Sequence, residues 1–280
     1  MVDLHHHFSG EVTFSLRKSG LATRARRDRC YYVWRYLVAM LAKIKRAFSL
    51  SILAFGFIAA PVFAIEVTEP AGAAHGFPGL CDINGKKLAD GEFRQWVEDK
   101  RLHIVITYKF PDGQVFEENA LFRQHPELTQ EKWSWRETRN GKLSREFTAD
   151  FLTKAATALT HENNTPKQWS ENIAVEPGRT FAGFGFTLAL GNLRKRLIHG
   201  EKIELKAIGF MPKPQVATVT VSHGGIDRMR MSGRWLKGDH FIIHPEIPFI
   251  AKVFVHVPDT HIWLTNPPPA GFLRWEGPIV

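Results

Sequence analysis

Apolar and polar residues alternate through much of the chain after residue 80, which is the pattern of β-strands with one buried face. The segments 102–108 and 115–122 flank Pro111-Asp112-Gly113, and 132–138 and 142–151 flank Asn140-Gly141. Both of these short sequences are typical of turns, because Pro fixes φ while Asn and Gly accept positive φ. The sequence therefore predicts two hairpins. Further strands are predicted at residues 202–210, 216–222, 226–235, 241–244, 253–257 and 262–265.

One helix is predicted near residues 180–199. Its apolar residues recur at helical spacing, at Phe186, Leu190, Leu193 and Leu197. Arg194, Lys195 and Arg196 occupy its last turn, where cations interact favourably with the helix dipole, and Gly200 follows as a cap. Gly183 and Gly185 disfavour a helix, and the residues from 184 to 190 also alternate, so a strand is the other interpretation of the first half.

The spacing of these short strands suits a sandwich, a barrel or a strongly curved sheet. We expect a single, mainly β domain over residues 80–280, with a curved antiparallel sheet, as a half-barrel or a barrel, and one helix. Residues 65–79 are rich in Ala, Gly and Pro, which is typical of a flexible tether.

A predicted targeting signal precedes this domain. Lys43, Lys45 and Arg46 come before the uncharged apolar run 48–64, which ends in Val62-Phe63-Ala64. A basic segment, an apolar segment and a small residue at the end are the parts of a secretory signal peptide. We expect cleavage after Ala64, a periplasmic or secreted product, and a leader over residues 40–64. Residues 1–39 are then an upstream extension from a mis-chosen start codon. The competing interpretation is an uncleaved membrane anchor, for which the run is short.

Removal of the leader changes the charge. The whole chain has a formal charge of +9, but residues 1–64 carry ten of its 37 basic and three of its 28 acidic residues, which leaves +2. A nearly neutral exported protein gives little reason to expect nucleic acid as a partner. Of the two cysteines only Cys81 remains, so no intramolecular disulfide is expected.

No catalytic motif stands out. The sequence has neither a G-x-S-x-G nucleophile motif nor a phosphate-binding loop. His240 and His244 have the spacing of metal ligands only on a helix, and the residues between them favour a strand, which separates them by about 13 Å. His256 and His261 could join them only through the tertiary fold. We therefore predict no metal, cofactor or catalytic residue, and keep a hydrolase with scattered residues as an alternative.

Aromatic residues give the stronger signal. Trp133 and Trp135 share one face of a predicted strand, opposite Ser134 and Arg136. Large aromatics commonly fill the interior of a curved sheet, but a set of them can also line an apolar cavity. The candidate ligand-binding residues are Trp133, Trp135, Trp235, Trp263 and Trp275. Further along, Arg228 and Arg230 alternate with Met229 and Met231, which predicts one polar and one buried face.

Three segments carry a resemblance: Leu80–Gly85 (LCDING), the turn at 111–113, and Phe272–Pro278 (FLRWEGP). With the strand rhythm of residues 80–280 they resemble uncharacterised secreted proteins of Gram-negative bacteria, and more distantly the periplasmic half-barrel proteins related to lipoprotein carriers. That resemblance implies a curved sheet that wraps a helix and encloses a cavity for acyl chains. It assigns no functional residue. The proline-rich portion after Pro245, with Pro248, Pro258 and Pro267–Pro269, departs from it.

The expected function is binding of a lipid or other apolar small molecule in that cavity. An envelope hydrolase and a structural envelope protein that pairs through a sheet edge are the alternatives. No stable membrane span is expected after cleavage.

Overall fold

The computed structural model describes residues 3–7, 64–162, 165–211, 213–231, 233–246 and 257–278. All of the described residues belong to one compact unit. The apolar run up to residue 63, the predicted extension apart from Asp3–His7, and nearly all of the predicted strand 253–257 lie outside the described residues. The signal peptide and the start site therefore stay predictions.

The described chain is mainly β, with one described helix, α2, at Gly185–Ile198. The strands are β1 (Asp3–His7), β2 (Ala74–Gly76), β3 (Gly79–Cys81), β4 (Lys87–Glu98), β5 (Arg101–Lys109), β6 (Gln114–Arg123), β7 (Thr129–Arg139), β8 (Lys142–Asp150), β9 (Ala155–Glu162), β10 (Thr165–Asn172), β11 (Thr180–Phe181), β12 (Ile203–Met211), β13 (Lys213–Met231), β14 (Arg234–Pro245), β15 (Thr260–Asn266) and β16 (Phe272–Pro278).

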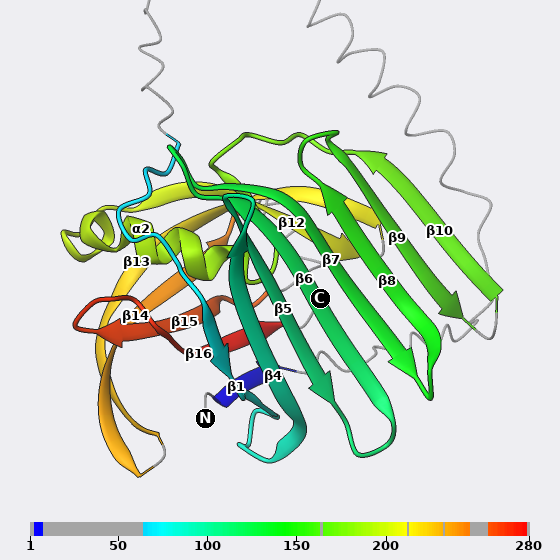
Figure 1. Cartoon of the computed structure of the whole chain (residues 1–280), viewed down its shortest axis with the longest axis horizontal. Helices are drawn as coiled ribbons and strands as arrows, with labels where there is room; N and C mark the ends of the chain where they lie inside the picture. Colours follow the sequence, from blue (N-terminus) through cyan, green and yellow to red (C-terminus); the bar gives the residue numbers. More distant parts are fainter. Residues whose placement is uncertain are drawn as a thin grey trace, which may run out of the picture. The chain divides into compact units, whose positions relative to one another are not determined.

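The strands form two antiparallel runs. One runs from β3 to β10 and the other from β12 to β16, in each case with sequence neighbours paired side by side. β1 lies parallel between β3 and β16, and β11 pairs parallel with β12. Figure 1 shows the two runs as layers whose strands cross, with α2 beside the second run. The predicted fold class is confirmed as a curved sheet with one helix, and it is not a closed barrel.

The two predicted hairpins are confirmed, since β5 pairs with β6 and β7 with β8. Asn140 and Gly141 both have positive φ, 48° and 76°, as the tight turn between β7 and β8 requires. The prediction missed seven of the described strands: β1, β2, β3, β4, β9, β10 and β16.

Three predicted boundaries were wrong. The predicted strand 226–235 contains both the end of β13 at Met231 and the start of β14 at Arg234. Residues 216–222 and 226–231 form a single long strand, β13, interrupted only by a bulge near Gly224. The predicted break at Lys237-Gly238-Asp239 lies inside β14. Helix α2 begins at Gly185, and Thr180–Phe181 before it is a strand. The predicted helix over residues 180–199 and the alternative strand in its first half therefore each describe part of the segment.

Aromatic side chains join the two layers. Phe210 of β12 stacks on Trp133 of β7 and Phe147 of β8, with ring centroids 5.4 and 4.9 Å apart. At the other end Phe184, just before α2, contacts both Phe93 of β4 and Phe272 of β16. Buried aromatics are large contributors to a core, so these contacts fix how the layers lie on each other.

A buried ion pair ties α2 to the second run. Arg194 of α2 bonds Asp239 of β14, and Asp239 is completely buried. Asp239 also accepts a 2.8 Å hydrogen bond from the Asn266 side chain of β15. A buried carboxylate without its cation is very costly, so Asp239 constrains the position of the helix.

Among the described residues, no helix is both long enough and apolar enough to cross a bilayer.

Replacement of Asp239 by Ala leaves Arg194 buried without its partner, and we expect it to lower the free energy of unfolding by about 3–5 kcal/mol. Urea denaturation followed by circular dichroism measures this. The matched control is Glu201→Ala, which breaks the half-exposed pair with Arg196 and should cost less than about 1 kcal/mol. Equal costs for the two variants would contradict this account of Asp239.

Candidate functional site

The outer face of the first run carries a groove that crosses the strands. Inward-facing residues of β5 to β8 enter the core, so their sequence neighbours face outward. The strand register aligns the outward residues in rows. One row consists of small or medium side chains: Val105, Asn119, Ser134, Thr148 and Thr157.

Rows of longer side chains lie on both sides of this floor. On one side the register places Trp96, His103, Leu121, Lys132 and Asp150. On the other it places Thr107, Glu117, Arg136 and Glu146. The surface is hollowed where the row of short side chains lies beside the row from Trp96 to Asp150, and the groove there has a volume of about 480 Å³. That is in the range of small-molecule sites.

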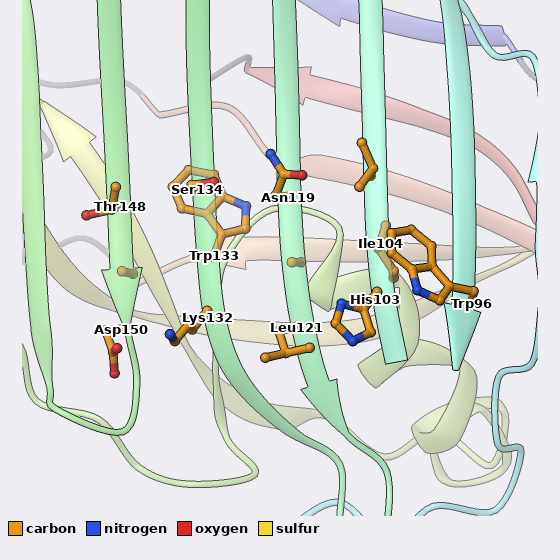
Figure 2. A pocket seen from close by; sticks show the side chains of 13 residues that line it. Trp96, His103, Ile104, Asn119, Leu121, Lys132, Trp133, Ser134, Thr148 and Asp150 are labelled. Carbon is orange, nitrogen blue, oxygen red and sulfur yellow. The ribbon is translucent and has the colours of Figure 1, made fainter. Parts of the chain in front are cut away.

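An aromatic pair forms one end of the groove. Trp96 of β4 and His103 of β5 stack with ring centroids 5.1 Å apart and planes 11° from parallel (Figure 2). Trp96 stays 37% exposed, and its indole N–H donates to Glu98 at 3.3 Å. The pair therefore offers a flat apolar surface next to the polar floor.

Charged groups form the opposite end. Lys132 and Asp150 are cross-strand partners on β7 and β8, and Figure 2 shows both at the far side from Trp96. The pKa of Asp150 is lowered, chiefly because its carboxylate accepts a hydrogen bond from the backbone N–H of Thr153. Leu152 donates a second backbone bond, and Lys132 adds a favourable charge. Asp150 is thus held as an anion, which suits binding and not proton donation.

A second hollow lies inside, between the two layers and the start of α2. Its volume is about 30 Å³, which is room for a water molecule or two. Apolar and aromatic side chains line most of it, among them Ile106, Trp135, Phe272 and Trp275. The polar lining includes the carboxyl of Glu118 and the hydroxyl of Tyr108.

Glu118 caps α2 from a different strand. Its Oε1 accepts hydrogen bonds from the backbone N–H of Phe184 at 2.7 Å and from the indole of Trp133 at 2.8 Å. Gln130 of β7 binds the backbone of Ala182, two residues before Phe184. Its side-chain oxygen accepts from the N–H of Ala182, and its side-chain nitrogen donates to the carbonyl. Gly183 is required between them, because it has a φ of +52° and a Cβ there would stand 2.0 Å from Oε1 of Glu118.

Burial raises the pKa of Glu118 above its ordinary value, although the hydrogen bonds from Phe184 and Trp133 act in the opposite direction. Burial also raises the pKa of Tyr108, and the charge of Glu118 adds to that shift. The Tyr108 hydroxyl is buried without a hydrogen-bond partner within the described structure.

The five predicted tryptophans do not share a site. Trp133 and Trp135 are both buried on the core side of β7, as their spacing predicted, and Trp135 and Trp275 line the internal hollow. Trp263 is buried elsewhere, where it donates to Asp227 at 2.8 Å and stacks on His240. Trp235 is 62% exposed on β14. Sequence reasoning missed Trp96 as a site residue, because β4 itself was not predicted.

The histidines meet only in part. His240 and His261 lie on neighbouring strands, with Nε2 and Nδ1 2.8 Å apart, while His244 pairs with Asp259. Burial lowers the pKa of His240, as does His261. Within the described residues no three His, Cys, Asp or Glu side chains are grouped so that they could hold a metal ion, and His256 lies outside them.

The chain matches no family model, and no curated protein sequence or solved structure is similar enough to point to a relative. The resemblance to half-barrel carriers stays a prediction.

Glu118→Gln tests the buried carboxyl through the pH dependence of stability. Because the pKa of Glu118 is raised in the folded state, its protonated carboxyl contributes fully to the free energy of unfolding of the wild type at acid pH. That contribution is lost as the pH rises above the ordinary glutamate range. The amide cannot ionise and still accepts both hydrogen bonds. We therefore expect the melting temperature of Glu118→Gln, relative to wild type, to increase as the pH is raised from 4 to 8.

The control is Glu127→Gln, an exposed carboxyl in the loop between β6 and β7, which should follow the wild type. If the melting temperature of Glu118→Gln relative to wild type stays constant or falls as the pH rises, Glu118 has no raised pKa.

Proposed function

We propose that this is an exported binding protein of the bacterial envelope, and that it holds an extended, hydroxyl-rich ligand such as an oligosaccharide in the outer groove. The single observation that carries the proposal is the groove across β4–β8, with a polar floor and the Trp96–His103 pair at one end. Export rests on the leader sequence, and the ligand class rests on the chemistry of the groove.

The floor suits hydroxyl groups. Asn119, Ser134 and Thr148 stand in register on three adjacent strands, so they repeat at the strand spacing of about 4.8 Å. An amide and hydroxyls both donate and accept hydrogen bonds, which matches a sugar hydroxyl better than an acyl chain. Because the row runs across the strands, the ligand that fits it is an extended one.

The aromatic end suits the other part of a sugar ring. A pyranose presents polar edges and an apolar face, and a flat indole covers such a face while its surroundings stay hydrated. Lys132 and Asp150 at the opposite end provide charged partners for further polar groups. The groove therefore combines both kinds of contact in one open site.

An apolar ligand beneath α2 is the second candidate, as expected from the tryptophan content. The apolar lining of the internal hollow favours it. The hollow of about 30 Å³ is too small for an acyl chain, so such a ligand requires α2 to move away from Glu118 and Gln130.

The outer site is tested with the purified protein, screened on a printed array of bacterial oligosaccharides and titrated calorimetrically with the best ligand. We expect Trp96→Ala to weaken binding on the order of tenfold, since a truncated tryptophan at a contact surface commonly costs more than 1 kcal/mol. Ser134→Phe fills the floor without entering the core and should abolish binding.

Trp235→Ala is the matched control, because Trp235 is also an exposed tryptophan but lies on β14, away from the groove. It should bind as the wild type does. Unchanged affinity in both Trp96→Ala and Ser134→Phe, or an array without any bound sugar, would refute the outer site.

A further inference from the structure

Strands β13 and β14 extend past their neighbours as a two-stranded ribbon. β12 pairs with β13 no further than Val221, and β15 pairs with β14 no further than Lys237. Residues 226–237 are here called the ribbon, and within the described part of the chain they have only each other as strand partners along most of their length. Figure 1 shows the ribbon reaching away from α2 and from the other strands. The described residues of the ribbon are exposed, apart from Met229 and Met231, which are half-buried.

One face of the ribbon is basic and aromatic. Arg228 pairs across the strands with Lys237, and Arg230 pairs with Trp235. The guanidinium of Arg228 lies 5.5 Å from the centroid of the Trp235 ring, within range of a cation–π contact. Trp235 nevertheless remains well exposed, so this face presents a large aromatic among cations.

The opposite face carries the apolar side chains of Met229, Met231 and Leu236, together with Arg234 and Asp227. Met229 lies opposite Leu236, and Met231 lies opposite Arg234. The sequence predicted a buried face for Met229 and Met231, but both are only half-buried and Leu236 is exposed. Ile226, at the base of the other face, is 56% exposed. Such a group of exposed apolar side chains marks an interaction surface.

The charge of the ribbon is concentrated. Arg228, Arg230, Arg234 and Lys237 oppose the single carboxylate Asp227, which gives the ribbon +3, whereas the rest of residues 65–280 has a net charge of −1. Asp227 is itself engaged, since it accepts the indole N–H of Trp263 and lies 3.6 Å from Nδ1 of His240. A nearly neutral protein therefore has one strongly cationic projection.

We propose that the ribbon docks the protein on an anionic phospholipid bilayer. Cations near such a surface are attracted to its phosphates, tryptophan settles at the headgroup level, and methionine and leucine enter the edge of the acyl region. A nucleic acid would also attract the arginines and stack on Trp235, but it offers nothing to Met229 and Leu236. These apolar side chains therefore favour the bilayer.

Co-sedimentation of the purified protein with phosphatidylglycerol vesicles and with phosphatidylcholine vesicles, at about 0.1 M salt, tests the proposal. We expect binding to the anionic vesicles only, and weaker binding as salt is raised. Each cation near an anionic surface contributes about fivefold to the affinity, so Arg228→Gln with Arg230→Gln should bind roughly 25-fold more weakly.

Met229→Ser with Leu236→Ser removes apolar side chains from the opposite face and keeps every charge, and it should also weaken binding. Lys109→Gln with Lys142→Gln removes two exposed cations elsewhere and is the matched control, which should bind as the wild type does. All variants should melt like the wild type, because the ribbon lies outside the core.

Equal binding to both vesicle types, or ribbon variants that bind as tightly as the wild type, would overturn the proposal. Ribbon-dependent binding of a single-stranded oligonucleotide without binding to the vesicles would overturn it in favour of a nucleic acid. The oligosaccharide titration and the Trp96→Ala variant report on the outer groove separately, so either proposal can fail alone.

Discussion

Two buried carboxylates hold helix α2 between the strand runs, and the arrangement of the core depends on them. Glu118 of β6 accepts a hydrogen bond from the backbone of Phe184, just before α2, and Asp239 of β14 pairs with Arg194 in the second half of α2. Both carboxylates are buried, where a polar group without a partner is costly. The helix can therefore neither slide nor turn without leaving at least one of these groups unpaired, and the aromatic contacts between the layers follow from its position.

This constraint divides the first sheet into two faces with different freedom. The inner face packs against the helix and Phe210, so its side chains either fill the core or hydrogen-bond to a buried polar group. The outer face meets no such demand on β5 to β8, and short side chains can stand in a row there. The groove lies where Asn119, Ser134 and Thr148, which are short, stand beside the row from Trp96 to Asp150.

The sequence predicted those elements whose signals are local. Asn140-Gly141 favours a tight hairpin turn by its own backbone preferences. Trp133 and Trp135 lie two residues apart on a strand and therefore share a face. β4 was missed because its charged and polar residues leave it mostly exposed, without clean alternation. β9 and β10 were missed because small and polar residues give them no apolar period. The groove depends on the register of several strands at once, which no single segment encodes.

Native mass spectrometry of the protein purified from a bacterial envelope tests the central claim, that the ligand lies outside the sheet and not beneath α2. The account predicts a processed chain that begins at Ile65 and carries a sugar-containing ligand, which is lost in Ser134→Phe. A co-purified acyl-chain ligand that Ser134→Phe retains would contradict it and would place the site beneath the helix.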